Sequence, residues 1–126
     1  MRLLLDTHVV LWQLSGLRRL GERAQEAIAA AGELAFSVVS FAEIGIKAAI
    51  GRLTVPDDLH AHVSGAGVRV LGLTPDHGLA VARLPPHHRD PFDRLLVAQA
   101  RLDGFTLLTG NPRMRAYDIP VVDALD

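Results

Sequence analysis

Residues 84–109 read LPPHHRDPFDRLLVAQARLDGFTLLT, and they carry the clearest structural signal in the chain. The tetrapeptide DPFD at 90–93 has the chemistry of a helix start, because it offers an N-cap carboxylate, a proline in the first turn and an acid at the third position. Gly104 is the residue expected to end this helix, and the apolar run at 105–109 predicts a buried strand. A helix that leads directly into a buried strand is typical of α/β domains.

The same alternation of strands and helices extends over the rest of the chain. We expect Ser40 to be the N-cap of the third helix and Gly51 to end it. The alternation favours a single α/β domain over residues 1–126 with a parallel sheet. The expected strands are 3–5, 34–39, 68–73, 105–109 and 119–122, and the expected helices are 9–14, 22–31, 41–50, 57–64, 75–84, one from Asp90-Pro91 to Gly104, and a short one from Asn111.

Composition excludes several classes of protein. The chain has 126 residues, 49% of them apolar, with 13 basic and 14 acidic side chains and no cysteine. The lack of cysteine excludes disulfides, thiolate metal sites and a cysteine nucleophile. A formal charge of −1 excludes nucleic-acid binding by bulk electrostatics alone, so any such contact must use local charge. No apolar run approaches the ~18 to 20 residues of a membrane helix, and no signal peptide is evident, so we expect a cytoplasmic protein without membrane contact.

Four polar side chains stand where predicted strands or loops lead into helices. They are Asp6, Glu43, Asp93 and Asn111. Because the carboxyl ends of parallel strands meet at one edge of a sheet, and ligands bind where the strand order reverses, the four side chains are expected to share one site.

Each of these residues also has a capping role as an alternative. Glu43 would complete a capping box with Ser40, Asp93 stands in the same relation to Asp90, and Asp6 and Asn111 are favourable N-caps. Asp6 differs from the others because it follows three leucines and is expected to be buried. A buried carboxylate requires a partner.

Three carboxylates that face one crevice would repel one another unless a cation lay between them. Oxygen donors without cysteine suit Mg²⁺ or Mn²⁺ rather than zinc. The histidine pairs at 60/62 and 87/88 lack acidic companions at ligand spacing, so no metal site is predicted there. A hard divalent cation at a cluster of carboxylates indicates metal-assisted phosphodiester chemistry with an activated water.

Four segments together resemble a known family. They are LLLDTHVVLW (3–12), SVVSFAEIGIKAAIGRL (37–53), LPPHHRDPFDRLLVAQARLDGFTLLT (84–109) and IPVV (119–122). In this order and spacing, the chain resembles a PIN-domain ribonuclease of the VapC toxin type over nearly its whole length. The resemblance implies a three-layer α/β/α domain with a central five-stranded parallel sheet, and an endoribonuclease that depends on Mg²⁺ or Mn²⁺. It also implies a homodimer and a small cognate antitoxin.

The resemblance assigns the catalytic and metal-binding carboxylates to Asp6, Glu43 and Asp93, with Thr7 and Thr109 as supporting hydroxyls. The family commonly has an acid in a Thr-x-Asp pattern where this chain has Asn111. An asparagine keeps an oxygen ligand but carries no charge, so we expect it to be a weak metal ligand, with one ion bound and a second bound weakly or not at all. The alternative is a catalytically weakened module that binds RNA or its antitoxin without efficient cleavage.

The candidates for contact with RNA are four basic residues near the expected site. They are Lys47, Arg89, Arg94 and Arg113. For Lys47 the alternative is a helix ion pair with Glu43, worth about 0.3 kcal/mol, and for each arginine it is a solvated surface position. Trp12 lies on an apolar helix face and is expected in the core or at a dimer interface.

One further enzyme class is disfavoured by the first predicted strand. A phosphotransferase with Asp6 as nucleophile would generally have a second aspartate two residues later, where this chain has His8.

Overall fold

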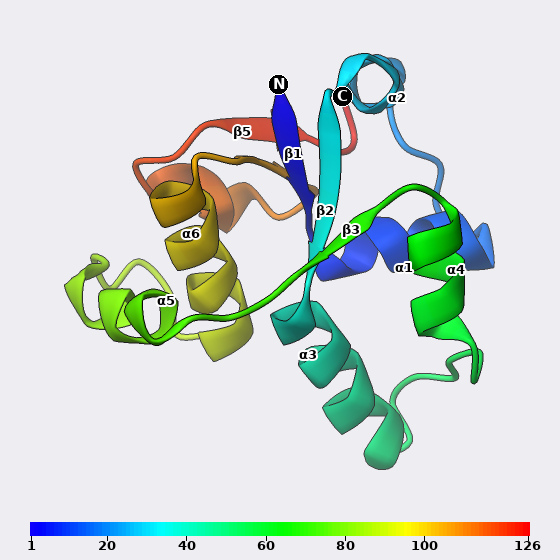
Figure 1. Ribbon diagram of the computed structural model, residues 1–126, viewed down its shortest axis with the longest axis horizontal. Coiled ribbons are helices and arrows are strands. Elements are labelled where there is room, and N and C mark those ends of the chain that lie inside the picture. The colour runs from blue at the N-terminus through cyan, green and yellow to red at the C-terminus, as the bar shows by residue number, and fades with distance from the viewer.

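The computed structural model describes residues 1–126, and its five strands form one sheet in the order β3-β2-β1-β4-β5 (Figure 1). All four strand pairings are parallel. The chain builds outward from β1 to β3 and then returns to the other side of β1, so the strand order reverses between β1 and β4. The strands are β1 (Arg2–Leu5), β2 (Glu33–Ser37), β3 (Arg69–Leu71), β4 (Thr106–Thr109) and β5 (Val121–Asp123).

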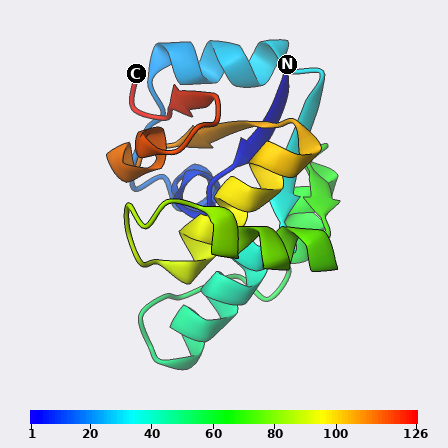
Figure 2. The ribbon, with the colours of Figure 1, turned by 90° about the vertical axis from the view of Figure 1, so that its left-hand side faces the viewer.

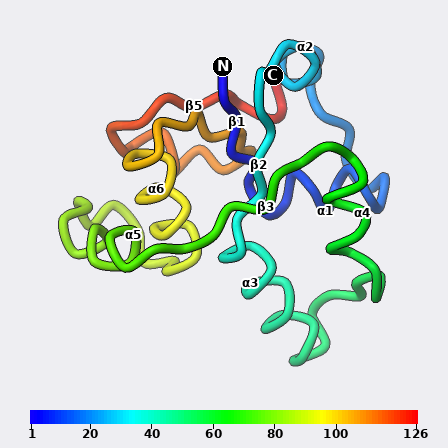
Figure 3. Tube along the Cα trace, viewed as in Figure 1, coloured from blue at the N-terminus to red at the C-terminus, as the bar shows by residue number.

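Helices cover both faces of the sheet. In Figures 1 and 2, α5 and α6 lie on one side, whereas α1 and α4 lie on the other. Figure 3 shows the chain passing from α4 through β3 to α5, which carries it from one face to the other. The helices are α1 (Thr7–Ser15), α2 (Glu22–Ala30), α3 (Val38–Ala49), α4 (Leu59–Gly65), α5 (Pro75–Ala80) and α6 (Pro91–Asp103), with two 3₁₀ helices, η1 (Val81–Arg83) and η2 (Pro112–Ala116).

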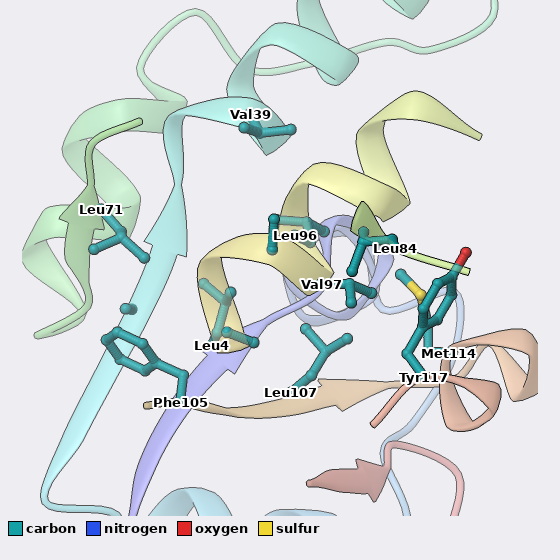
Figure 4. Packing of buried hydrophobic residues seen from close by; sticks show 13 residues of the cluster. Leu4, Val39, Leu71, Leu84, Leu96, Val97, Phe105, Leu107, Met114 and Tyr117 are labelled. Carbon is teal, nitrogen blue, oxygen red and sulfur yellow. The ribbon is translucent and has the colours of Figure 1, made fainter. Parts of the chain in front are cut away.

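Two apolar cores lie on opposite faces of the sheet. Successive side chains of a strand point to opposite faces, so Leu4 packs in one core while Leu3 and Leu5 pack in the other. The first core joins the sheet to α6 and to the chain around η2, and Figure 4 shows Val97 of α6 close to Leu84, Met114 and Tyr117. The second core joins the sheet to α1, α2, α3 and α4. Helices on both faces of a five-stranded parallel sheet confirm the predicted α/β/α arrangement.

The predicted N-cap of the third helix was wrong. The helix α3 begins at Val38, and its N-cap is Ser37, whose hydroxyl accepts a hydrogen bond from the Val39 amide at 3.0 Å. The strand β2 ends two residues before the predicted strand did, because Ser37 turns the backbone into the helix. Ser40 therefore lies inside α3, where it is fully buried.

Other boundaries moved by a few residues. The predicted helix at 75–84 divides into α5 and η1, and the predicted strand at 68–73 shortens to β3. Asp90 and Gly104 flank α6 as predicted, and Gly104 adopts the left-handed conformation, with φ of 73°. None of the helices is both long and apolar enough to cross a lipid bilayer.

Candidate active site

Asp6 lies at the carboxyl end of β1 and is the N-cap of α1. Its Oδ1 accepts a hydrogen bond from the Thr7 amide at 2.7 Å, and its Oδ2 accepts one from the Thr109 hydroxyl at 2.6 Å. The residue is only 3% exposed. Burial raises the pKa of Asp6, while the hydrogen bond from Thr109 opposes that rise. The structure thus holds a carboxylate in a place where its ionisation is costly.

Glu43 projects from the second turn of α3 into the same region and is also buried, at 2% exposure. Lys47 lies one turn later and places its Nζ 2.5 Å from Glu43 Oε2. The predicted capping box with Ser40 does not form, since the helix begins earlier and the Ser40 hydroxyl instead accepts a hydrogen bond from the Thr7 hydroxyl at 2.7 Å. The second carboxylate oxygen, Oε1, is buried with no hydrogen-bond partner.

Asp93 lies in the first turn of α6. The N-cap role at this helix belongs to Asp90, whose Oδ1 accepts hydrogen bonds from the backbone amides of residues 92 and 93. The carboxylate of Asp93 is therefore available for other contacts. Burial, followed by the negative charges of Asp6, Asp90 and Glu43, raises the pKa of Asp93 to about 7. Because the charges of Asp6 and Glu43 raise the pKa of Asp93, the three carboxylates lie close enough to interact electrostatically.

A buried histidine contacts Asp93. His88 Nε2 lies 3.2 Å from Asp93 Oδ2, and its Nδ1 lies 2.9 Å from the Tyr117 hydroxyl. Burial lowers the pKa of His88, which favours the neutral ring. In the neutral tautomer that satisfies both contacts, the Tyr117 hydroxyl donates to Nδ1 and the Nε2–H donates to Asp93. Arg94 donates in turn to the Tyr117 hydroxyl at 3.1 Å.

Sequence reasoning did not assign a role to His88 or Tyr117. The loop before α6 carries two prolines and folds back over the first turn of that helix. No periodicity or spacing in the sequence predicts this loop conformation. The only available signal was a histidine five residues before a site carboxylate.

Asn111 follows β4 and approaches the site through its amide nitrogen. Its Nδ2 donates to Asp93 Oδ2 at 3.3 Å, while its Oδ1 accepts the backbone N–H of Arg113 at 3.0 Å and caps η2. The oxygen that was expected to be a weak metal ligand is therefore engaged in a cap. The Thr109 hydroxyl donates to Asp6, whereas the Thr7 hydroxyl donates to Ser40 and Thr7 reaches Asp6 only through its backbone amide.

The donor chemistry of these three carboxylates fits a hard divalent cation. All the donors are oxygens, Glu43 Oε1 has no partner, and the mutual repulsion of the carboxylates would be relieved by a positive ion. No group of three acidic or histidine side chains is, however, drawn together at ligand distance in this structure. The fit to a divalent cation therefore rests on the oxygen donors of the three carboxylates and on their negative charge, which the protein does not fully neutralise.

The four basic candidates have different surroundings. Lys47 is paired with Glu43, whereas Arg89 and Arg113 are exposed and make no ion pair. The expectation that Arg94 contacts RNA is corrected by the structure. Its guanidinium donates to the carbonyl oxygens of residues 81, 84 and 85 and to Tyr117, so it ties the loop before α6 to the helix.

Comparison with known proteins gives concordant results. Residues 3–120 match the model of the PIN domain. The chain is 34% identical over 125 residues to Ribonuclease VapC22 from Mycobacterium tuberculosis (strain ATCC 25618 / H37Rv), an alignment that covers 93% of this chain and 92% of that protein.

Solved structures with the same fold include two toxin–antitoxin complexes on DNA. The crystal structure of VapBC2 from Rickettsia felis bound to a promoter DNA fragment contains a chain that matches with a TM-score of 0.74 at 13% identity, covering 98% of both chains. The DNA-bound VapBC structure from Salmonella typhimurium matches with a TM-score of 0.67 at 16% identity, again covering 98% of both chains.

Proposed function

Because this chain belongs to the PIN-domain family, we propose that it is a metal-dependent endoribonuclease and the toxin of a toxin–antitoxin pair. The observation that carries the proposal is the set of three buried carboxylates, Asp6, Glu43 and Asp93, which come from separate segments and share one end of the sheet. Three acids buried together are costly unless a cation accompanies them. The chemistry that uses such a cation on a polyanion is phosphodiester hydrolysis.

The cofactor in this proposal is Mg²⁺ or Mn²⁺, held by Asp6, Glu43 and Asp93. When bound, such an ion activates a water for attack at phosphorus and offsets the negative charge that develops there. Glu43 Oε1 supports this assignment, since it is buried and has no donor within the protein.

The protein itself orients each carboxylate. The Thr7 amide and the Thr109 hydroxyl hold the two oxygens of Asp6. Lys47 holds one oxygen of Glu43, which leaves the other free to bind. His88 and Asn111 contact the same oxygen of Asp93, so its other oxygen has no protein donor. A contact with a neighbouring group thus restricts the side-chain rotamer of each of the three carboxylates.

The RNA backbone is held in this proposal by Arg89 and Arg113, which are exposed and unpaired beside the site. Burial lowers the pKa of His88, and the positive charge of Arg113 lowers it further. Arg113 therefore lies near the histidine that contacts Asp93. One bound divalent ion also changes the formal charge from −1 to about +1, which makes the protein less repulsive to RNA. Binding should therefore weaken as salt increases.

The partners in this proposal are a small cognate antitoxin and a second copy of the chain. The toxin–antitoxin complexes among the structural neighbours support the antitoxin. Exposed apolar side chains, among them Leu17, Ile50 and Leu79, support burial of further surface in such assemblies.

Induced expression in a bacterial host tests the toxin function. Wild-type chain should arrest growth, co-expression of its cognate antitoxin should relieve the arrest, and Asp6→Asn should abolish it while leaving the fold intact. Arg23→Gln, at a remote exposed ion pair, is the matched control and should remain toxic. Arrest that persists in Asp6→Asn would contradict the proposal.

A second candidate function is favoured by Asn111. If the missing acid weakens catalysis, the chain would act by binding RNA or its antitoxin without efficient cleavage. Asn111→Asp distinguishes the two, because it replaces the amide donor at Asp93 with a fourth negative charge. A large gain in metal affinity and cleavage rate would favour the second candidate, and unchanged values would remove its support.

A further inference from the structure

A hollow of about 290 Å³ opens directly beside the site, and Asp6, Trp12 and Arg18 lie on its walls. A second hollow of about 340 Å³ shares Trp12 and Arg18 and adds Arg19. These two hollows adjoin at the Trp12 side chain. They lead from the Asp6 carboxylate to two arginines that the sequence did not place at the site.

The indole of Trp12 is positioned by a glycine. Gly110 lies in the turn that follows β4, and a Cβ added there would come within 2.8 Å of Trp12 Cη2. Because Gly110 has no side chain, the indole edge rests directly on this turn, next to Asn111. The ring is half-buried, so part of it remains open to the hollow.

Arg18 is brought to the same ring by the end of α1. Gly16 adopts the left-handed conformation, with φ of 68°, and its amide donates to the Trp12 carbonyl at 2.9 Å. This turn folds the chain back so that the Arg18 guanidinium lies 5.5 Å from the centre of the indole. Arg18 and Arg19 are exposed and neither forms an ion pair. An aromatic ring with unpaired arginines beside it is the combination that binds single-stranded nucleic acid.

We propose that Trp12, Arg18 and Arg19 form a nucleotide subsite, here called the Trp12 subsite, next to the scissile phosphate. One base of single-stranded RNA stacks on the open part of the Trp12 indole, and Arg18 and Arg19 hold the adjoining phosphate. The subsite rests on the proposed function, since it extends the same RNA path outward from the carboxylates. It makes Trp12 a determinant of where along the RNA the chain cuts.

Fluorescence tests the subsite directly, because Trp12 is the only tryptophan in the chain. The probe is a short single-stranded RNA added to Asp93→Asn protein, which is expected to leave it uncut. Stacking should quench the Trp12 emission, and an abasic site at one position of the RNA should remove most of the quenching. Absence of quenching at RNA concentrations that saturate binding, or equal quenching by every abasic RNA, would overturn the proposal.

Kinetics on otherwise wild-type protein supply the second test. Trp12→Leu should raise KM by about tenfold, the loss expected when one base–aromatic stack is removed, while Trp12→Phe should keep most of the affinity. Arg18→Gln leaves the indole on Gly110, so it tests the subsite even if Trp12→Leu does not fold. It should raise KM and flatten its salt dependence, with kcat little changed. Unchanged KM in Arg18→Gln and Trp12→Leu would contradict the subsite.

The two proposals fail separately. If wild-type protein cuts no RNA in Mg²⁺, the proposed function is wrong, and quenching of Trp12 by RNA still decides whether the subsite exists. If it cuts RNA with unaltered KM in the subsite variants and without quenching, the function stands and the subsite is wrong.

Discussion

The Thr109 hydroxyl donates a 2.6 Å hydrogen bond to Asp6 Oδ2, and it thereby joins residues 103 positions apart in the sequence. Thr109 ends β4 and Asp6 follows β1, the two strands between which the strand order reverses. The parallel register that pairs Leu5 with Leu108 brings the two groups together. The sheet itself therefore sets the position of the first carboxylate.

Replacing Thr109 with valine should impair the site without altering the sheet. The buried Asp6 would lose its hydroxyl donor, and the pKa of Asp6 would rise further because that hydrogen bond now lowers it. We expect the acid limb of the cleavage profile to move to higher pH and the free energy of unfolding to fall by about 1 to 3 kcal/mol. Thr109→Ser keeps the hydroxyl and should stay close to wild type. Identical pH profiles for the valine and serine variants would contradict this role.

The stability of the metal-free protein should depend on pH through Asp93. The pKa of Asp93 is about 7 in the folded chain, against 3.8 as the reference value, so the folded chain retains a proton that the unfolded chain releases. Its contribution to stability is complete below about pH 4 and is lost as the pH rises through 7. In chelator, the Tm of wild type relative to Asp93→Asn should fall between pH 5.5 and 8. Parallel Tm curves for the two proteins would refute the prediction.

Lys47 should matter for stability because it neutralises a buried acid. Lys47→Gln leaves Glu43 without its partner, and the free energy of unfolding should fall by about 1 to 2 kcal/mol. The double variant Glu43→Gln/Lys47→Gln removes both charges and should recover most of this loss, yet it should not cut RNA. Chemical denaturation of the three proteins measures the effect. A double variant less stable than Lys47→Gln would argue against the pair.

His88 should act through Asp93, whereas the adjacent His87 should not. His88→Phe keeps a ring in the loop but removes the donor to Asp93, so Mn²⁺ affinity and kcat should both fall, by about tenfold if one charge-assisted hydrogen bond is lost. His87 is exposed and packs its ring against Tyr117 without touching Asp93, so His87→Phe is the matched control. Calorimetric titration with Mn²⁺ separates the two variants. Equal affinities would exclude the positioning role.

The elements that depend on local chemistry were predictable from the sequence. The helix α6 follows from Asp90, Pro91 and Gly104, since each acts within a few residues of itself. The N-cap of α3 was predicted wrongly because Ser37 and Ser40 are both acceptable caps, and only the length of β2 selects between them. Parallel strand ends likewise placed Asp6 near the other acids, which is a consequence of topology.

Contacts made by loops and by unpaired atoms could not be predicted in the same way. The link from Tyr117 through His88 to Asp93 needs a loop conformation that no periodicity encodes. The direction in which Asn111 presents its amide depends on the cap that its oxygen makes to η2. The internal role of Arg94 depends on three carbonyl groups that become available where α5 and η1 end. These features are set by tertiary packing.

Cleavage of single-stranded RNA by the purified chain, measured with Mg²⁺ and with chelator, tests the central claim most directly. The account predicts cleavage in Mg²⁺, none in chelator, and a rate at least about a hundredfold lower in Asp93→Asn. Asp90→Asn is the matched control, because asparagine also caps the same helix, and it should retain cleavage. Cleavage that survives chelator and Asp93→Asn would show that these carboxylates do not hold the metal that cuts RNA.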